Sequence, residues 1–235
     1  MLAAWSGLAV LNGDASVLPG PWHVAPLVLQ EIASGELARH LSATLLRVVL
    51  AFLFAMLIGT LAGLVMGRSK ATDRWLDPWL IAALNLPALV TIVLCYLWIG
   101  LNEIAAVTAV AINKIPSVAV TIREGARALS RPLDDMAQVF AMPLSRRIAH
   151  VILPQLAPFL ASAARSGIAL IWKIVLVVEF LGRSDGIGFQ IHLYFQLFDV
   201  AMVLAYALSF IVVMLTVETL LVRPWEARTT RWRRA

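Results

Sequence analysis

Among the charged side chains inside long apolar runs of this sequence, four are candidates for a functional site: Lys114, Arg165, Lys173 and Glu179. A charge inside a bilayer is costly, so each is by default a candidate for lining a path through a membrane. If the solute is an anion, Lys114 and Lys173 are best placed to attract it, although either could instead neutralise buried carboxylates or carbonyls. Arg165 lies near the end of its apolar run, so its long side chain could place the charge in water, and a structural role is favoured. Glu179 could also simply reach water.

The sequence lacks the motifs of the common catalytic sites. It has no Gly-x-x-x-x-Gly-Lys-Ser/Thr phosphate loop, so ATP hydrolysis by that route would need another polypeptide. It has no His-Glu-x-x-His motif, no paired aspartates on one apolar run and no serine–histidine arrangement. The single Cys95 offers neither an internal disulfide nor a metal cluster. We therefore expect no enzyme, no cofactor and no metal site in this chain. Its four histidines fall in loops or at run edges, which disfavours a haem site: His23, His40, His150 and His192.

The composition is that of a membrane protein. Hydrophobic residues make up 61% and charged residues 14% of the 235 residues, and the mean hydropathy is +0.86. Such a chain needs a bilayer as its solvent. The formal charge of +5 could indicate nucleic acid, but the basic residues lie between the apolar runs, as they do in cytoplasmic loops of inner-membrane proteins. We expect one integral membrane domain over residues 1–235, surrounded by lipid, and no nucleic-acid partner.

Five apolar runs are long enough to cross a bilayer, which takes about 20 helical residues. They are 41–66, 76–100, 103–122, 156–181 and 200–222. The sequence therefore predicts an all-α integral membrane fold with five to six transmembrane helices and a core at 41–222.

The segments outside these runs are less regular. Residues 1–12 are apolar but short, and could be a truncated or atypical first helix. Within the N-terminal part, 1–40, glycines and prolines then predict a loop, and 27–40 a short amphipathic helix. Residues 182–199 read as a turn-rich external loop, and 223–235 as a basic tail.

Prolines and small residues shape two of the runs. Pro78 and Pro87 lie inside 76–100, where neighbouring helices can satisfy the freed carbonyls, so we expect kinks rather than a break. Gly59, Gly63 and Gly67 stand four apart on one helical face. This spacing lets a second helix approach closely and predicts tight helix packing.

Residues 130–158 form the one long amphipathic segment. Its apolar residues recur every three or four positions, which predicts one apolar helical face. These residues are Leu133, Met136, Phe140, Leu144, Ile148 and Val151. Pro143 interrupts the pattern, so we expect two short helices, 132–142 and 143–153. Asp134 and Asp135 place negative charge in the first turn of the first helix, where the helix dipole favours it.

The distribution of basic residues predicts the orientation. Of the 19 lysines and arginines, thirteen fall on the side of the amphipathic segment and two on the opposite side, Arg39 and Arg183. The thirteen are Arg68, Lys70, Arg74, Arg123, Arg127, Arg131, Arg146, Arg147, Arg223, Arg228, Arg231, Arg233 and Arg234. By the positive-inside rule, the amphipathic segment and the C-terminus are cytoplasmic in a multi-pass inner-membrane protein.

The segment resembles the cytoplasmic loop of the permease subunits of bacterial binding-protein-dependent ABC importers. That loop reads Glu-Ala-Ala, three residues, Gly, nine residues, Ile, one residue, Leu-Pro. Here the counterparts are Asp135, Met136 and Ala137, then Ala141, then Val151, Leu153 and Pro154. Residues 35–47, 66–70, 76–78 and 168–188 look like the nitrate, sulfonate and taurine branch of these permeases.

The resemblance implies a type I importer permease fold whose loop at 130–154 forms coupling helices in a groove of an ATPase subunit. It also implies two paired permeases, two ATPases that bind ATP and magnesium, and an extracytoplasmic solute-binding protein. For the ATPase contact, Asp135, Arg146 and Arg147 are the polar candidates. The remaining candidates in the segment are Asp134, Met136, Ala137, Phe140, Ala141, Leu144, Val151, Leu153 and Pro154. Packing of the apolar members against the permease's own helices is an equally open reading.

Three alternatives stay open at this point. The segment could be an interfacial amphipathic helix pair without a partner. The chain could be a secondary transporter or channel that works without ATP, or a membrane-embedded enzyme. The sequence leaves the solute unnamed, although a small anion such as a sulfonate, taurine or nitrate fits the resemblance. It also leaves open whether the first helix is complete and whether the permease pairs with itself or with a relative.

Overall fold

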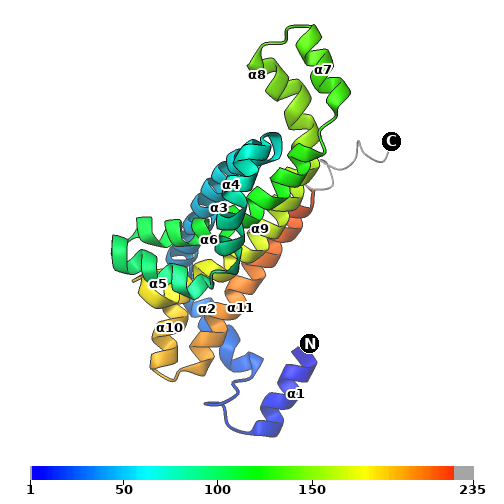
Figure 1. Ribbon diagram of the computed structural model, residues 1–235. Helices are drawn as coiled ribbons and strands as arrows, with labels where there is room; N and C mark the ends of the chain where they lie inside the picture. Colours follow the sequence, from blue (N-terminus) through cyan, green and yellow to red (C-terminus); the bar gives the residue numbers. More distant parts are fainter. Residues whose placement is uncertain (1, 225–235) are drawn as a thin grey trace. The chain divides into compact units, whose positions relative to one another are not determined.

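The computed structural model describes residues 2–224, without the side chains of residues 221 and 222. Within that part of the chain every regular element is helical (Figure 1). In chain order the elements are α1 (Leu2–Asn12), α2 (Pro21–Ser34), α3 (Glu36–Arg68), α4 (Lys70–Asn85), α5 (Ala88–Ile99), α6 (Glu103–Arg127), α7 (Arg131–Val139), α8 (Leu144–Arg147), η1 (Ile148–Ile152, a π-helical turn), α9 (Leu153–Gly182), α10 (Ile187–Gln196), α11 (Val200–Val217) and η2 (Glu218–Val222, π-helical). Most of the predicted tail, 225–235, lies outside the described residues.

The chain forms two compact units that are interleaved along the sequence. The first unit contains residues up to 50 together with 92–110 and 172–220. The second unit contains 51–91, 111–171 and the residues from 221 on. Each unit brings together segments that are far apart in the sequence, so each has its own set of tertiary contacts.

Length and composition qualify three of the described helices as membrane spans: α3, α6 and the helix that runs from Val200 to Leu220. The pair α4 and α5 makes a fourth if it counts as one broken span. The predicted span at 156–181 corresponds to α9, whose 30 residues include Arg165, Lys173 and Glu179. The described helices thus form the all-helical membrane fold that the sequence predicts.

The predicted span at 76–100 is broken rather than kinked. Helix α4 ends at Asn85, α5 begins at Ala88, and the chain bends by 98° between them. Leu86 has extended angles (φ −70°, ψ 124°), as expected for a residue that precedes a proline. Pro87 therefore ends one helix and leads into the next, whereas Pro78 is accommodated inside α4.

The N-terminal boundaries also differ from the prediction. The amphipathic helix expected at 27–40 is divided between α2 and α3. Gly35 separates the two helices, with a left-handed φ of 81° that glycine adopts without strain, and its N–H donates to the Ile32 carbonyl. The first long span accordingly begins at Glu36, five residues before the predicted start.

The segment 182–199 is only partly a loop, because it contains α10 from Ile187 to Gln196. The sequence predicts turns here because of the glycines at 182, 186 and 188 and the polar residues between them. For this reason the helix α10 was not predicted. The turn itself is short and precedes α10.

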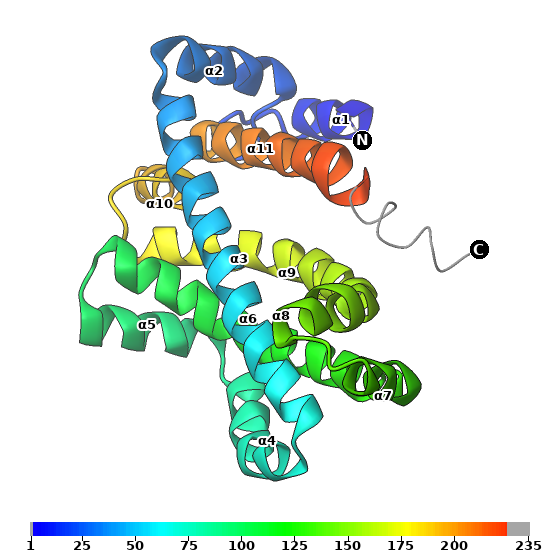
Figure 2. The ribbon, with the colours of Figure 1, turned by 90° about the horizontal axis from the view of Figure 1, so that it is seen from above.

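Within the second unit, the three glycines of α3 lie against α6, and Figure 2 shows α3 passing across α6. A Cβ atom added at Gly59 would stand 2.6 Å from Cβ of Val118. One added at Gly63 would collide with the Ala119 carbonyl oxygen. At Gly67 it would lie 2.5 Å from Cβ of Ala126. The absence of side chains at these three positions is what allows the two helix backbones to approach so closely.

Candidate functional site: a helical hairpin and a buried ionic network

The amphipathic segment folds as a helical hairpin between α6 and α9 (Figure 1). Pro132 lies in the first turn of α7, and Pro143 is the N-cap of α8. The predicted end of the second helix at 153 is wrong, because α8, η1 and α9 continue with helical angles as far as Gly182. The π-helical turn of η1 ends at Ile152, two residues before Pro154. A wider turn at this point accommodates the missing N–H and the bulky ring of that proline.

Asp134 holds the base of the hairpin together. Its Oδ2 lies 2.7 Å from a guanidinium nitrogen of Arg68 at the end of α3, and its Oδ1 lies 2.9 Å from one of Arg147 in α8. Burial alone would raise the pKa of Asp134, but hydrogen bonds from Arg147 and Arg68 outweigh burial and hold the pKa below its ordinary value. Asp134 and Arg147 are thus engaged inside the hairpin and its support.

The other candidates of the segment fall into two groups. Ala137 and Val151 are buried, so their side chains serve the hairpin's own packing. The exposed candidates are Asp135, Met136, Phe140, Ala141, Leu144, Arg146, Leu153 and Pro154. Among them Phe140 is 74% exposed and Leu144 is 68% exposed, although both are large and apolar. Val139, which the sequence analysis did not select, is 82% exposed beside them.

The turn of the hairpin contains a strained residue. Ala141 has a φ of 47°, in the left-handed region that alanine rarely adopts. This is the position at which the resembling loop has glycine. The hairpin therefore keeps a backbone shape that suits glycine while carrying an alanine.

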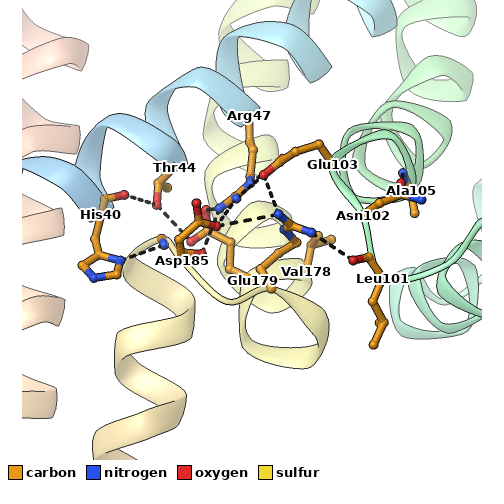
Figure 3. A network of polar contacts seen from close by, with 12 residues as sticks. His40, Thr44, Arg47, Leu101, Asn102, Glu103, Ala105, Val178, Glu179 and Asp185 are labelled. Atoms are coloured by element: carbon orange, nitrogen blue, oxygen red, sulfur yellow. Dashed lines mark hydrogen bonds and ion pairs between the residues drawn. The ribbon is translucent and has the colours of Figure 1, made fainter.

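A second cluster, which we call the Arg47 network, lies in the first unit (Figure 3). The Arg47 guanidinium donates to Glu103 at 2.9 and 2.5 Å and to an oxygen of Glu179 at 2.7 Å. It also donates to the backbone carbonyl of Asp185 at 3.0 Å and to the carboxylate of Asp185. Arg183 donates to Glu103 at 2.7 Å. One buried cation thereby connects α3, α6, α9 and the turn before α10.

The same network closes the N-terminus of α10. Three consecutive backbone N–H groups there find side-chain acceptors: Gly186 donates to His40 Nδ1 at 3.0 Å, Ile187 to Thr44 Oγ1 at 2.9 Å, and Gly188 to Glu179 Oε2 at 2.9 Å. These N–H groups have no partner within their own helix. Because Nδ1 of His40 accepts a hydrogen bond, it carries no proton.

Sequence reasoning missed most of this network. Of its members, only Glu179 was selected, as a path candidate that could also reach water; the structure excludes contact with water, because the side chain is fully buried against Arg47. A usable signal was present. His40, Thr44 and Arg47 are spaced by four and three residues, which places three polar side chains on one face of an otherwise apolar helix. A polar stripe inside a span predicts polar partners.

The remaining path candidates differ in burial. Lys114 is only 3% exposed, and its Nζ lies 3.4 Å from the hydroxyl of Ser166 within the second unit. A Cβ added at Gly167 would lie 3.1 Å from Cε of Lys114, so the small residue leaves room for the lysine stem. Arg165 and Lys173 are exposed on α9. Lys114 and Arg165 belong to the second unit, and Lys173 and Glu179 to the first.

The fold and the hairpin define a class: a multispan helical membrane protein that presents a helical hairpin from between two of its long helices. Residues 41–223 match the family of binding-protein-dependent transport system inner membrane components, and the chain belongs to this family. The predicted family is thereby confirmed, and the protein is the membrane-spanning subunit of an ABC importer.

Individual relatives agree with this assignment. The chain is 30% identical over 236 residues to a protein of Bacillus subtilis described as an aliphatic sulfonates transport permease, SsuC; the match covers 99% of this chain and 84% of that protein. It is 32% identical to the riboflavin transport system permease protein RibX of Chloroflexus aurantiacus, over 97% of this chain and 87% of the relative. A crystal structure of an amino acid ABC transporter with histidines has the same fold, with a TM-score of 0.67 and 22% identity; the likeness covers 85% of this chain and 96% of that one.

Proposed function

We propose that the α7–α8 hairpin is the surface on which a separate ATPase subunit docks. We define the coupling surface as the exposed side chains of Asp135, Met136, Val139, Phe140, Leu144 and Arg146. The observation that carries the proposal is the exposure of Phe140 and Leu144 on a hairpin that Asp134 already braces from within. Large apolar side chains that a polar helix leaves uncovered are typical anchors for a partner protein.

The hairpin's connection to α9 supplies a route for coupling. Helical backbone angles continue from α8 through η1 into α9, which ends at Gly182. We infer that closure of two ATPase subunits on ATP and magnesium pulls two such hairpins together and that α9 carries this displacement toward Glu179 and the opposite side of the membrane. The chain has no phosphate loop of its own, so the energy comes from the partner.

The docking proposal is tested by co-purification with a candidate ABC ATPase subunit, followed by a measurement of the affinity of the complex and of its ATP turnover. Phe140→Ala and Leu144→Ala each remove an anchor, and we expect each to weaken the complex by about 2 kcal/mol, or roughly 30-fold. Asp135→Lys reverses a charge on the same surface and should lower both assembly and turnover. Leu197→Ala is the matched control, because Leu197 is an equally exposed leucine in the other unit.

Normal association of the Phe140 and Leu144 variants would show that the ATPase docks elsewhere. Solute flux driven by an ion gradient, with no association with any ATPase, would favour the secondary transporter. Binding of the hairpin to lipid vesicles but not to the ATPase would favour the interfacial helix pair. Each outcome is read on protein whose thermal unfolding matches the wild type.

We further propose that the solute is a small organic anion of the sulfonate class and that Lys114 attracts it. Support comes from the SsuC relative and from a buried cation whose described polar contact is a single hydroxyl, that of Ser166. The RibX relative makes riboflavin the competing solute. In proteoliposomes containing the full transporter, we expect Lys114→Met to lower uptake of an alkanesulfonate by at least tenfold while leaving ATPase docking intact. Preserved uptake in a folded Lys114→Met variant, or preference for riboflavin, would overturn the proposal.

The remaining partners follow from the family. We propose that an extracytoplasmic binding protein delivers the solute and that a second copy of this chain completes the membrane part. The hairpin and the C-terminus then face the cytoplasm. Cross-linking of two differently tagged copies tests the homodimer, and failure of the tagged copies to pair would favour a heterodimer with a relative.

A further inference from the structure

A cavity of about 680 Å³ lies in the second unit, beside the turn between α3 and α4 and the ends of α6 and the start of α7. Its lining contains an unusual number of cations: Arg68, Lys70, Arg74, Arg127 and Arg131. Apolar atoms of Met66, Gly67, Ala126 and Leu129 complete the wall. The lining of the pocket thus combines positively charged and apolar side chains.

The two carboxylates in this wall are already used. Asp73 pairs with Arg127 at 2.5 Å and with Arg123 at 3.3 Å. Asp134 pairs with Arg68 at 2.7 Å and with Arg147, as described above. Each carboxylate therefore faces two guanidinium groups, and the acids of the wall do not compensate its positive charge.

Three cations of the wall form no ion pair with any residue that the structure describes: Lys70, Arg74 and Arg131. For Arg74, the described hydrogen bond is a long one of 3.4 Å from Nε to the Lys70 carbonyl. Three positive charges that converge on one cavity repel one another, and a bound anion would relieve that repulsion. The pocket therefore has an excess of positive charge that its own carboxylates do not neutralise.

The tryptophans of α4 indicate where this pocket lies relative to the bilayer. Trp75 and Trp79 stand one helical turn apart and are 71% and 69% exposed. Paired exposed indoles of this kind are typical of the membrane–water interface. The cations of the lining begin in the preceding turn of the same helix, at Lys70 and Arg74, and so lie at the level of the lipid headgroups.

We propose that this pocket binds the phosphate group of an anionic phospholipid, with Lys70, Arg74 and Arg131 as its ligands. Basic pockets at the cytoplasmic ends of spans suit such headgroups, and the apolar part of the lining suits the first carbons of the acyl chains. A bound headgroup bridges α4 and α7 and thereby anchors the base of the hairpin to the membrane. The site is separate from the coupling surface and does not depend on the identity of the solute.

The test is native mass spectrometry of the detergent-purified chain titrated with phosphatidylglycerol or phosphatidylcholine. We expect tighter binding of phosphatidylglycerol, and a loss of about fivefold in its affinity for each of Arg74→Gln and Arg131→Gln, with phosphatidylcholine unaffected. Arg74→Lys keeps the charge and should retain most of the affinity. Arg146→Gln removes one positive charge from the same predicted side of the membrane but outside the pocket, and should leave lipid binding unchanged.

Equal affinity for the two lipids would overturn the proposal, and so would an equal loss in the Arg146→Gln variant. A third arm adds inorganic phosphate at millimolar concentration. Displacement of phosphatidylglycerol by free phosphate would assign the pocket to a soluble oxyanion and overturn the lipid. Thermal unfolding of each variant is measured in the same preparation, so that a misfolded variant is recognised. If Arg74→Gln misfolds, the comparison of wild type with Arg74→Lys takes its place.

Discussion

At the scale of single residues, Arg47 is a buried cation that pairs with three carboxylates. It faces Glu103, Glu179 and Asp185 at once, and Glu179 is fully buried. A buried carboxylate that loses its only close cation cannot be hydrated, and its desolvation cost is then left uncompensated. The arginine is therefore indispensable to the carboxylates around it.

We predict that Arg47→Met destabilises the protein by about 3 kcal/mol, because it leaves Glu179 buried without a charge partner. Arg47→Lys should recover only part of this loss. The planar guanidinium donates hydrogen bonds to several carboxylates at once, and the compact ammonium group of lysine cannot reproduce that geometry. Thermal unfolding in detergent measures the effect. Arg39→Gln is the control, because Arg39 is exposed and its described ion pair is with Glu36, outside the Arg47 network. Equal unfolding of the Arg47 and Arg39 variants would contradict the prediction.

Ala141 offers a substitution that should stabilise. Its left-handed φ of 47° costs about 1 kcal/mol relative to glycine. We expect Ala141→Gly to raise the unfolding midpoint slightly or to tighten ATPase docking, because the turn no longer resists its own shape. Ala149→Gly provides the comparison, since Ala149 lies in a helical turn where glycine destabilises. A loss of stability in Ala141→Gly similar to that in Ala149→Gly would refute the argument.

At the scale of elements, the hairpin should respond to pH through Asp134. Its pKa is lower in the folded protein, so the Arg68 and Arg147 pairs contribute stability above the ordinary pKa of an aspartate. That contribution is lost as the pH falls through the lowered folded pKa. We expect Asp134→Asn to cost about 1–2 kcal/mol at neutral pH.

The measurement compares the unfolding of wild type and Asp134→Asn from neutral to acidic pH. Other carboxylates titrate in both proteins, so the difference between the two isolates Asp134. It should shrink as the pH falls. A difference that stays constant would show that Asp134 acts through packing rather than through its charge.

The elements also show how far the sequence could lead. The all-helical fold, the long spans and the position of the hairpin follow from apolar periodicity and from the prolines at 132 and 143, because these features act locally. The break at Pro87 and the helix α10 were not anticipated. Whether a proline kinks or ends a helix depends on tertiary neighbours, and α10 is completed by acceptors from α3 that lie about 140 residues earlier.

The site shows the same limit. Three exposed apolar residues of the coupling surface, Met136, Phe140 and Leu144, follow from their spacing in the sequence, whereas Val139 was not selected. The bracing role of Asp134 was not predicted, because Arg68 lies in another helix and the sequence gives no indication of their distance. The Arg47 network was missed for the same reason, since its cation and its carboxylates come from separate segments.

At the scale of the whole molecule, the charge distribution makes a prediction about topology. We expect a cysteine placed at Leu144 to react with a membrane-impermeant maleimide only from the cytoplasmic side, and one at Phe198 only from the outside. Both positions are exposed, and the native Cys95 is buried and can be replaced by serine beforehand. Labelling of both cysteines from the same side of intact cells would contradict the predicted orientation.

The Arg47 network also has a consequence for how the protein is made. The carboxylate of Glu103 follows Arg47 by 56 residues along the chain, and that of Glu179 by 132. At a synthesis rate of about 5–20 residues per second, the arginine waits roughly 10 s in the nascent chain before Glu179 emerges. During that interval an inserted α3 carries a charge that can pair at most with Glu103, because Glu179 and Asp185 have not yet been synthesised. The network is therefore completed only when the segment that ends α9 and begins α10 has been synthesised, and a chain that stops before residue 179 leaves Arg47 without Glu179 and Asp185.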